Sequence, residues 1–453
     1  MENSAVTGLA AVRRSVGNLA GRGAPGATVS SGVLAVGVGL VVLGVTSYGF
    51  LVVAARRLDA SQFAQLSVVW TALFTIGPGL FLPLEQAVAQ RLAAGAAPVQ
   101  LLRRAAALAM TLLAMLVALS LALAPFISRR LLDSDVALFW AMLLTNCALA
   151  PVHLSRGLLA GTNQFGAYGL QLAFDGTVRL LGSIVLASAG VGSVTAYACV
   201  LIVSQLSATA VSLAVAFRPV RHAISAKPRS VITTGWVALA GGISWMLVAA
   251  LAGQSLANGG TVVVKAFAKP GDAVAGHFLT AVVLTRLPLF LFAALQASLL
   301  PLLARRIATG DVRGAAAGVR RLLAILGAVG AAASGLLLLA GPELDALVFG
   351  SQFRVARLPM VILSVASTFY ILAAGLGQAL LALESAAQVA LGWVSGTAVF
   401  LVALVLPGSL EVRVSVAFLL GAGVTFAGFL ASAGLRFHQR GVALIRRPAR
   451  VSP

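Results

Sequence analysis

The stretch Leu170–Ala187 reads LQLAFDGTVRLLGSIVLA and carries an acid, Asp175, and a base, Arg179, inside an otherwise apolar run. A helix needs about 20 predominantly apolar residues to cross the hydrocarbon core of a bilayer, and this run with its flanks is long enough. Charged side chains in such a segment are costly, and they almost always face the protein interior or water. Asp175 and Arg179 are one helical turn apart and can pair on one face. The stretch therefore predicts a membrane-spanning helix whose charged face points into the protein.

The composition of the whole chain agrees with that prediction. Of its 453 residues 60% are hydrophobic and 10% charged, which lies far outside the range of soluble proteins. The formal net charge of +20 is carried by short basic stretches between apolar runs. These stretches indicate topology signals and contacts with anionic membrane lipids, and no nucleic acid partner is expected. Cys147 and Cys199 each stand alone, so neither a metal site nor another cofactor is predicted.

Apolar runs recur along the chain, and their length predicts about twelve membrane spans. Continuous apolar runs favour helices, because the lipid-facing strands of a β-barrel would alternate and be about half as long. The predicted fold class is therefore an all-α polytopic membrane protein. The spans are expected to begin near Gly32, Gln65, Ala105, Val136, Tyr168, Ser193, Trp236, Gly276, Leu322, Leu358, Ala386 and Val412.

Basic residues between the spans predict the orientation, because cytoplasmic loops carry an excess of Lys and Arg. On this rule both termini face the cytoplasm, and the N-terminal tail has no apolar core of a signal peptide. The expected organisation is an N-terminal tail at 1–31, a first lobe at 32–217, a basic linker at 218–231, a second lobe at 232–435 and a basic tail at 436–453.

The two lobes are expected to be repeats of one another. Val52–Trp70 resembles Val262–Leu284, and Arg156–Leu170 resembles Gly377–Leu391. Because each lobe would hold an even number of spans, about six, both would have the same orientation. The sequence thus predicts two six-helix lobes related by a pseudo-two-fold axis along the membrane normal.

Prolines interrupt a span at corresponding positions of the two lobes. Pro78 and Pro83 fall in the second span, and Pro288 and Pro301 in the eighth. Distorted backbone is tolerated in a membrane where protein or a wet cavity receives it, so these breaks indicate a central substrate path. The alternative is that prolines are simply common in membrane helices.

Polar side chains inside the predicted spans are the candidate site residues. For Asp175 and Arg179, one interpretation is that the pair only fixes helix packing. The other is that the pair lines a cavity, where Arg179 grips a phosphate and Asp175 exchanges a proton. The hypothetical substrate-binding residues are Arg179, Arg286, Glu85, Gln86 and Gln90, and the hypothetical ion-coupling residues are Asp175 and Glu85.

Signatures of enzymes are missing from the sequence. No HExxH or GxSxG motif occurs, and the glycines of GRGAPGATVS lack the lysine of a phosphate-binding loop. No catalytic residue is predicted, and transport would have to run on an ion gradient, the membrane potential or a downhill substrate.

Four stretches carry a resemblance to a known family. They are AARRLDASQFAQLSVVWTALF, RGLLAGTNQFGAYGLQLAFDGTVRLLG, KPGDAVAGHFLTAVVLTRLPLFLFAALQASLLPLLAR and GPELDALVFGSQF. In this order and spacing they resemble the polysaccharide-exporter branch of the multidrug/oligosaccharidyl-lipid/polysaccharide (MOP) flippase superfamily, the Wzx-like lipid-linked oligosaccharide flippases. Members of this branch often carry an acid in the middle of the seventh span, where this chain has Asn258, Gly259 and Gly260.

The resemblance implies a V-shaped pair of lobes that works by alternating access in the bacterial inner membrane. The implied substrate is a polyprenyl-diphosphate-linked oligosaccharide, with glycosyltransferases or a polysaccharide polymerase as partners. Arg179 and Arg286, one in each lobe, would neutralise the diphosphate. An ion-coupled multidrug exporter of the same superfamily and a non-catalytic scaffold for polysaccharide assembly are the alternatives. A drug exporter would favour an aromatic-rich cavity, whereas a scaffold has no need for buried charge in both lobes.

Overall fold

The computed structural model describes residues 26–225, 236–286, 306, 309 and 311–445. Within these residues every regular element is a helix, so the predicted all-α fold class is confirmed. The first half of the chain forms α2 (Gly26–Arg57), α3 (Ala60–Ile76), η1 (Gly77–Phe81), α4 (Leu82–Ala93), α5 (Pro98–Ala122), α6 (Ala124–Phe126), η2 (Ile127–Leu131), α7 (Val136–Cys147), α8 (Leu149–Gly161), α9 (Phe165–Ser188), α10 (Val194–Val215) and α11 (Phe217–Ser225). The second half forms α12 (Trp236–Phe267), α13 (Val274–Thr285), α15 (Val312–Phe349), α16 (Arg357–Ala382), α17 (Ala386–Ala403) and α18 (Leu410–Ile445).

Eleven spans in the described part of the chain are long and apolar enough to cross a membrane. The predicted eighth span begins in α13, which is 12 residues long, and continues into 287–305, outside the described residues. Pro288 and Pro301 therefore also lie outside them. Large apolar side chains are exposed on the long helices, with Leu339 77% and Val402 70% exposed. Such a surface suits contact with lipid.

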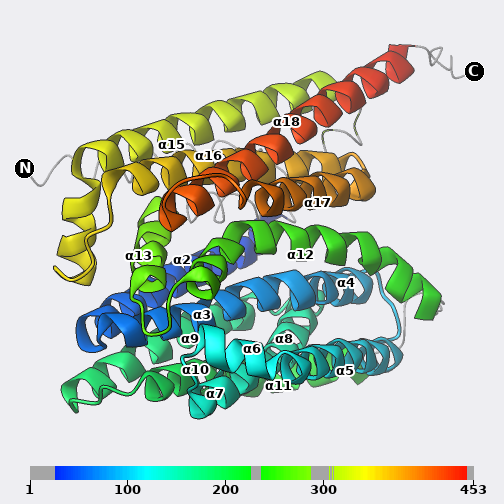
Figure 1. Ribbon diagram of the computed structural model, residues 1–453. Coiled ribbons are helices and arrows are strands. Elements are labelled where there is room, and N and C mark those ends of the chain that lie inside the picture. The colour runs from blue at the N-terminus through cyan, green and yellow to red at the C-terminus, as the bar shows by residue number, and fades with distance from the viewer. Residues whose placement is uncertain (1–25, 226–235, 287–305, 307–308, 310, 446–453) are drawn as a thin grey trace, which may run out of the picture.

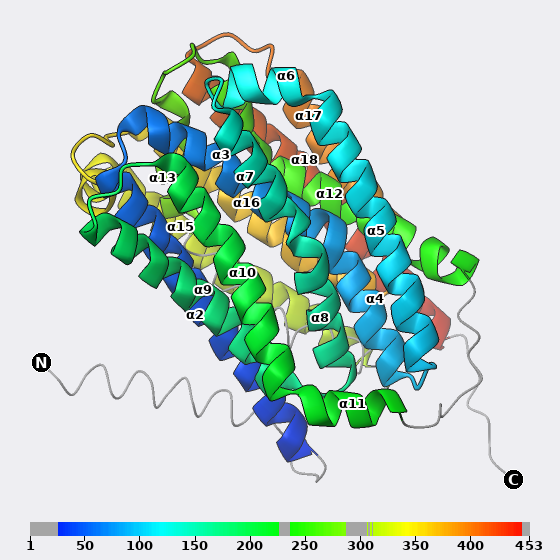
Figure 2. The same cartoon turned by 90° about the horizontal axis from the view of Figure 1, so that it is seen from below.

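Figure 1 shows the helices of the two halves stacked as two groups, with α15 to α18 on one side and α3 to α11 on the other. The long helix α12 lies between the groups, and Figure 2 shows α5, α8 and α10 on the outer face of the first half. In the first half the first span packs along the fifth, α2 against α9, and in the second half α12 packs against α17. The same pairing in both halves is what an internal repeat predicts.

Glycines allow the α2 and α9 backbones to touch. A Cβ atom built on Gly39 would lie 2.5 Å from the carbonyl oxygen of Gly169, and one built on Gly169 would lie 2.4 Å from that of Ala35. A side chain at either position would force the two helices apart, so this contact requires residues without a Cβ.

The predicted break in the second span is present as a π-helical turn. The turn η1 (GPGLF) joins α3 to α4, with Pro78 in its first turn and Pro83 near the start of α4. Proline lacks the N–H that continues an α-helical ladder, and wide π turns occur mostly as single interruptions of α-helices. The fourth span is also divided, because α7 ends at Cys147 and α8 begins at Leu149. Residues 218–225 of the predicted linker 218–231 lie in α11, and residues 226–231 lie outside the described residues.

Candidate functional site

A cavity of about 530 Å³ lies between the two halves of the chain. Its walls come from α2, α3, η1 and α4 of the first half and from α12, α13, α16 and α17 of the second. Most of the lining is apolar. The polar and aromatic lining side chains are Ser47, Tyr48, Trp70, Thr71, Phe74, Gln86, Gln254, Asn258, Thr261, Arg286, Tyr370, Gln378 and Trp393.

Arg286 brings a positive charge to the cavity wall. It follows the last residue of α13, and its guanidinium donates through Nη1 to Oδ1 of Asn258 at 2.6 Å and through Nη2 to the carbonyl oxygen of Ala257. Both acceptors are neutral, and among the described residues no carboxylate forms an ion pair with Arg286. A guanidinium held in this way keeps its charge and can bind an anionic ligand.

Asn258 holds Arg286 in place from the middle of α12. Its amide Nδ2 also donates to the carbonyl oxygen of Phe74, 3.2 Å away on α3, and to Oε1 of Gln254 at 3.0 Å. Asn258 is thus a contact between the two halves. An aspartate at this position would pair with Arg286 and neutralise it, so the asparagine preserves the positive charge of the cavity.

Asp175 and Arg179 form the predicted ion pair on α9. Nη2 of Arg179 lies 2.9 Å from Oδ1 of Asp175, and Nη2 of Arg156 on α8 lies 3.8 Å from the other carboxylate oxygen. Asp175 is 4% and Arg179 2% exposed, so the pair faces the protein interior as the sequence predicts. The second arginine makes the cluster a triad with a net positive charge.

The triad lies behind the cavity wall. Nη1 of Arg179 donates to Oγ of Ser47 at 3.1 Å, and its guanidinium carbon lies 5.6 Å from the centre of the Trp70 ring. Ser47 and Trp70 line the cavity, whereas Asp175 and Arg179 do not. In this conformation Arg179 supports the wall from the rear.

The three candidate residues on α4 occupy different environments. Gln86 lines the cavity, and Gln90 is exposed outside it. Glu85 is 4% exposed and points away from the cavity into the first half. Its Oε2 lies 2.7 Å from Nδ1 of His153 on α8, and the hydroxyl of Tyr168 on α9 donates to its Oε1 at 2.5 Å.

A partly buried polar layer joins the two halves beyond one end of the cavity. Asp133, in the loop between η2 and α7, accepts from Nζ of Lys265 at 2.8 Å and from Nε2 of Gln65 at 3.1 Å. It also accepts from the backbone N–H of Gly271 at 3.2 Å. The side chain of Lys265 has no solvent exposure. Lys265 and Gly271 belong to the second half of the chain, so the layer ties the halves together.

Further contacts between the halves occur at the same end. Arg56, near the end of α2, donates to the carbonyl oxygens of Leu347 and Val348. The rings of Phe63 and Phe353 pack edge to face with centroids 5.0 Å apart. On α12 the cavity lining ends at Thr261, one turn before Lys265, and on α3 it begins at Trp70, five residues after Gln65. The cavity is therefore shut at this end, which we name the closed end.

The hydrogen bonds of Asp133 at the closed end predict that the stability of the protein depends on pH. Burial raises the pKa of Asp133, but hydrogen bonds from Lys265, Gln65 and Gly271 outweigh it and hold the pKa below its usual value. A carboxylate with a lowered folded-state pKa stabilises the fold above its unfolded value of about 4, and this contribution disappears as the pH falls through the folded-state pKa. Asp133→Asn should cost about 1–3 kcal/mol at pH 7.

The measurement is thermal unfolding of the purified protein in detergent at several pH values. The deficit of Asp133→Asn relative to the native protein should shrink below about pH 4. Glu343→Gln is the matched control, since Glu343 is half exposed and its ion-pair partners, Arg354 and Arg357, are exposed as well. A deficit of Asp133→Asn that stays constant down to pH 3 contradicts this account of the layer.

Comparison with solved structures places the arrangement among known folds. A multidrug resistance MATE family transporter of the MOP superfamily, in an inward-facing conformation, matches 88% of this chain and 94% of its own with a TM-score of 0.62 and 13% identity. The chain has the MOP-superfamily fold. A MATE protein in a bent conformation matches 93% of this chain and 97% of its own, with a TM-score of 0.60 and 14% identity. The lipid II flippase MurJ, in an inward closed conformation, matches 89% of both chains with a TM-score of 0.59 and 11% identity.

The predicted resemblance to the MOP superfamily is thus confirmed at the level of the fold. No protein-family profile matches the sequence. An uncharacterized protein of Mycobacterium tuberculosis is 30% identical over 302 residues, which are 64% of this chain and 62% of that protein. The chain therefore spans less than two thirds of that relative. An uncharacterized protein of Mycobacterium bovis is 28% identical over 421 residues, 88% of this chain and 91% of its own.

Two sets of buried partners around the cavity could not be predicted from the sequence. Pairing of Glu85 with His153 and Tyr168 joins residues 68 and 83 positions apart in the chain, and pairing of Asp133 with Lys265 spans 132 positions. The sequence does indicate that Lys265 has a partner, because this lysine lies in an apolar run where an unpaired charge would be costly. Nothing in the sequence identified which partner.

Proposed function

We propose that this protein is a flippase that moves a polyprenyl-diphosphate-linked oligosaccharide across the bacterial inner membrane by alternating access. The observation that carries the proposal is Arg286, a guanidinium on the cavity wall with neutral hydrogen-bond partners. A diphosphate is the anionic part of such a substrate, and an arginine recognises phosphate oxygens through paired N–H donors.

The rest of the cavity lining supports a glycan beside the phosphate. Amide side chains of Gln86, Gln254 and Gln378 offer both donors and acceptors for hydroxyl groups, and the aromatic rings of Trp70 and Trp393 offer flat apolar faces. The polyprenyl tail would stay in the lipid while this head group crosses. In the proposed cycle Arg179 reaches the head group only when Ser47 and Trp70 move as the lobes rock.

Alternating access requires one end of the cavity to be shut at a time. The closed end lies where α2 ends at Arg57, which the positive-inside rule assigns to the outer side. The proposed state is therefore inward-facing, with both termini in the cytoplasm. The MATE family transporter compared above, which has this fold, is also in an inward-facing conformation. Glycosyltransferases that build the glycan, or a polymerase that consumes it, are the proposed partners.

A multidrug exporter is the second candidate. The cavity presents five aromatic side chains, a feature that favours flat organic cations or neutral drugs. They are Tyr48, Trp70, Phe74, Tyr370 and Trp393. Two solved structures with this fold carry the MATE name. The positive charge of Arg286 opposes a cationic drug, so we place this function second.

The test is mass spectrometry of polyprenyl-linked glycans in cells depleted of the protein. A completed lipid-linked oligosaccharide should accumulate on depletion and should disappear when the native protein is restored. Measuring the sensitivity of the same cells to a panel of cationic dyes tests the second candidate. If depletion leaves the lipid-linked pool unchanged and increases dye retention, the flippase proposal is wrong and the exporter is right.

A further inference from the structure

A groove of about 430 Å³ lies on the surface of the first half, between α2 and α9. Figure 2 shows these two helices side by side along one edge of the molecule. Apolar residues form the groove, which we name the α2–α9 groove, and they include Leu34, Val38, Gly39, Gly169, Leu170 and Ala173. Such a lining offers no partner to a polar group, so the ligand that fits it is a hydrocarbon chain.

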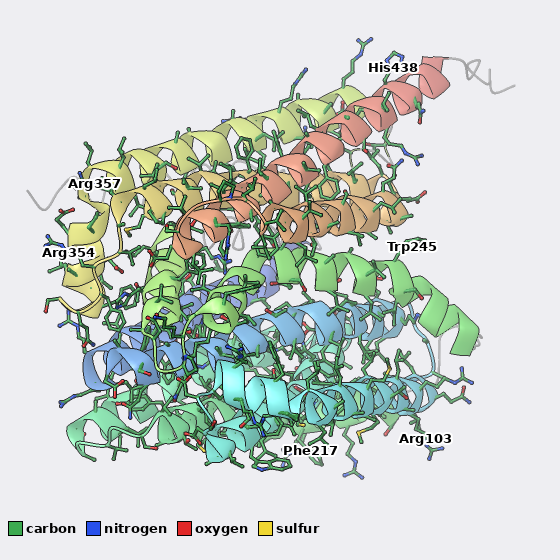
Figure 3. All side chains as sticks on the ribbon, viewed as in Figure 1. Arg103, Phe217, Trp245, Arg354, Arg357 and His438 are labelled. Atoms are coloured by element: carbon green, nitrogen blue, oxygen red, sulfur yellow. The ribbon has the colours of Figure 1, made fainter. Side chains whose placement is uncertain are left out.

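The α2–α9 groove lies toward the open end of the cavity. Both helices run toward the closed end, where the carbonyl oxygen of Gly192, just beyond α9, accepts from Nε2 of Gln62. The groove residues belong to the first half of each helix, away from that end. Figure 3 shows the two ends, with Arg354 and Arg357 at the closed end and Arg103 at the opposite one. In the proposed inward-facing state the groove therefore faces the cytoplasmic leaflet.

The groove and the central cavity adjoin across a single helix. Residues three and four apart share one face of a helix, and α2 carries one exposed apolar stripe made of Leu34, Val38, Val41 and Val45. Leu34 and Val38 line the groove, whereas Val41 lines the cavity and is 49% exposed. The cavity thus reaches the lipid-facing stripe at Val41, one helical turn from the groove.

This layout matches a ligand with one anionic head group and one long apolar chain. Arg286 on the cavity wall suits the phosphate groups, and the α2–α9 groove suits the chain. A polyprenyl diphosphate joins a single chain to its head group, so one chain crosses α2. A phospholipid would have to bring two acyl chains over the same helix. The glycines of the groove also leave room for the methyl branches of a polyprenyl chain.

We propose that the α2–α9 groove binds the polyprenyl tail of the substrate next to its head group, while the diphosphate lies beside Arg286. The inference rests on the flippase function proposed above and adds the site that selects the tail. Lipid is as apolar as the groove, so this selection depends on close packing and not on removal from water.

The experiment uses a polyprenyl phosphate that carries a photoreactive diazirine in the part of its tail nearest the phosphate. The purified protein is irradiated with this probe in nanodiscs of phosphatidylethanolamine and phosphatidylglycerol, and the labelled residues are mapped by mass spectrometry. Labels should concentrate on the groove residues of α2 and α9. The exposed apolar side chains of Leu339 and Val402 on the second half report random contact with the probe.

Competition shows which lipid the groove prefers. Excess unlabelled polyprenyl phosphate should suppress labelling of the groove. The same concentration of phosphatidic acid should not, because it carries the same kind of phosphate on two acyl chains. Equal suppression by phosphatidic acid would assign the groove to phospholipid chains and overturn the proposal, as would labelling no stronger than at Leu339 and Val402.

Two glycines provide a matched pair of variants. A Cβ atom on Gly166 or on Gly37 would meet no other atom within 4 Å, so both sites accept a larger residue. Gly166 lines the groove and Gly37 does not. Gly166→Leu should lower groove labelling at least about fivefold, because the new side chain occupies the space of the tail. Gly37→Leu should label as the native protein does, and equal labelling of both variants overturns the proposal.

Two further outcomes are decisive. If Gly166→Leu does not fold, the competition measured on the native sequence decides alone. A second copy of the chain is the other possible occupant, and Val38→Cys tests it after C147A and C199A remove the native thiols. A disulfide-linked dimer through Val38→Cys would assign the groove to that copy and overturn the proposal.

The labelling needs neither a glycan nor transport, so its failure is separate from that of the proposed function. Labelling that polyprenyl phosphate suppresses, in a protein whose depletion leaves the lipid-linked pool unchanged, would support the groove and overturn the flippase. Accumulation of the lipid-linked glycan on depletion, with labelling that polyprenyl phosphate does not suppress, would retain the flippase and overturn the groove.

Discussion

Replacing Arg286 by glutamine is expected to slow clearance of the lipid-linked glycan at least about 30-fold, because losing a charged hydrogen-bond donor to an anion costs about 2 kcal/mol or more. Glutamine keeps a donor near Asn258 and removes only the charge. Arg286→Lys should retain part of the activity, since an ammonium keeps the charge and loses the paired geometry of the guanidinium. The readout is the lipid-linked pool in depleted cells that express each variant at equal level.

Asn258→Asp provides the matched test without touching Arg286. The carboxylate would replace an amide oxygen that already lies 2.6 Å from Nη1, so it would form an ion pair and neutralise the cavity charge. We expect a folded protein with activity as low as that of Arg286→Gln. Full activity in both variants would remove Arg286 from the substrate path and with it the main support for an anionic substrate.

Removal of Asp175 alone is expected to destabilise the protein by about 3–5 kcal/mol, because it leaves two arginines without a buried counter-charge. Asp175→Asn is nearly isosteric, so the loss would come from the charge and not from packing. The measurement is thermal unfolding in detergent, with the fraction of folded protein followed by size-exclusion chromatography.

The double variant Asp175→Asn with Arg179→Met separates stability from function. Removing both charges of a buried pair is often close to neutral for stability, so the double variant should recover most of the loss. If it folds and clears the lipid-linked glycan normally, the pair acts only in packing. If it folds and is inactive, Arg179 reaches the substrate during transport, as the proposed cycle requires. Equal stability of the native protein and Asp175→Asn would contradict the buried triad.

The fold was largely predictable because its signals are local. Apolar runs of bilayer length predicted the spans, and most of their starts lie within a few residues of the observed helices; the ninth was expected near Leu322 and its helix begins at Val312. Pro78 in the second span predicted the break that is present as η1. The partnership of Asp175 with Arg179 was also predictable, since the helical repeat alone places residues four apart on one face.

The role of each buried charge was not predictable in the same way. Arg179 and Arg286 are equivalent as sequence signals, each a cation in an apolar run, yet Arg286 lines the cavity and Arg179 lies behind Ser47 and Trp70. In the sequence Asn258 marks only the absence of an acid from the seventh span. Its position beside Arg286 in the structure explains why Arg286 stays positive.

The sequence by itself determined that the chain crosses a membrane many times and that its buried charges face inward, because bilayer thickness and the cost of charge in lipid act on every helix separately. Only the tertiary structure decided which helix faces meet. That choice pairs Glu85 with His153 and Tyr168, places Lys265 on Asp133 at the closed end and leaves Arg286 on the cavity wall. Helical periodicity defines the faces of one helix, whereas the packing of all helices together selects the neighbours of each face.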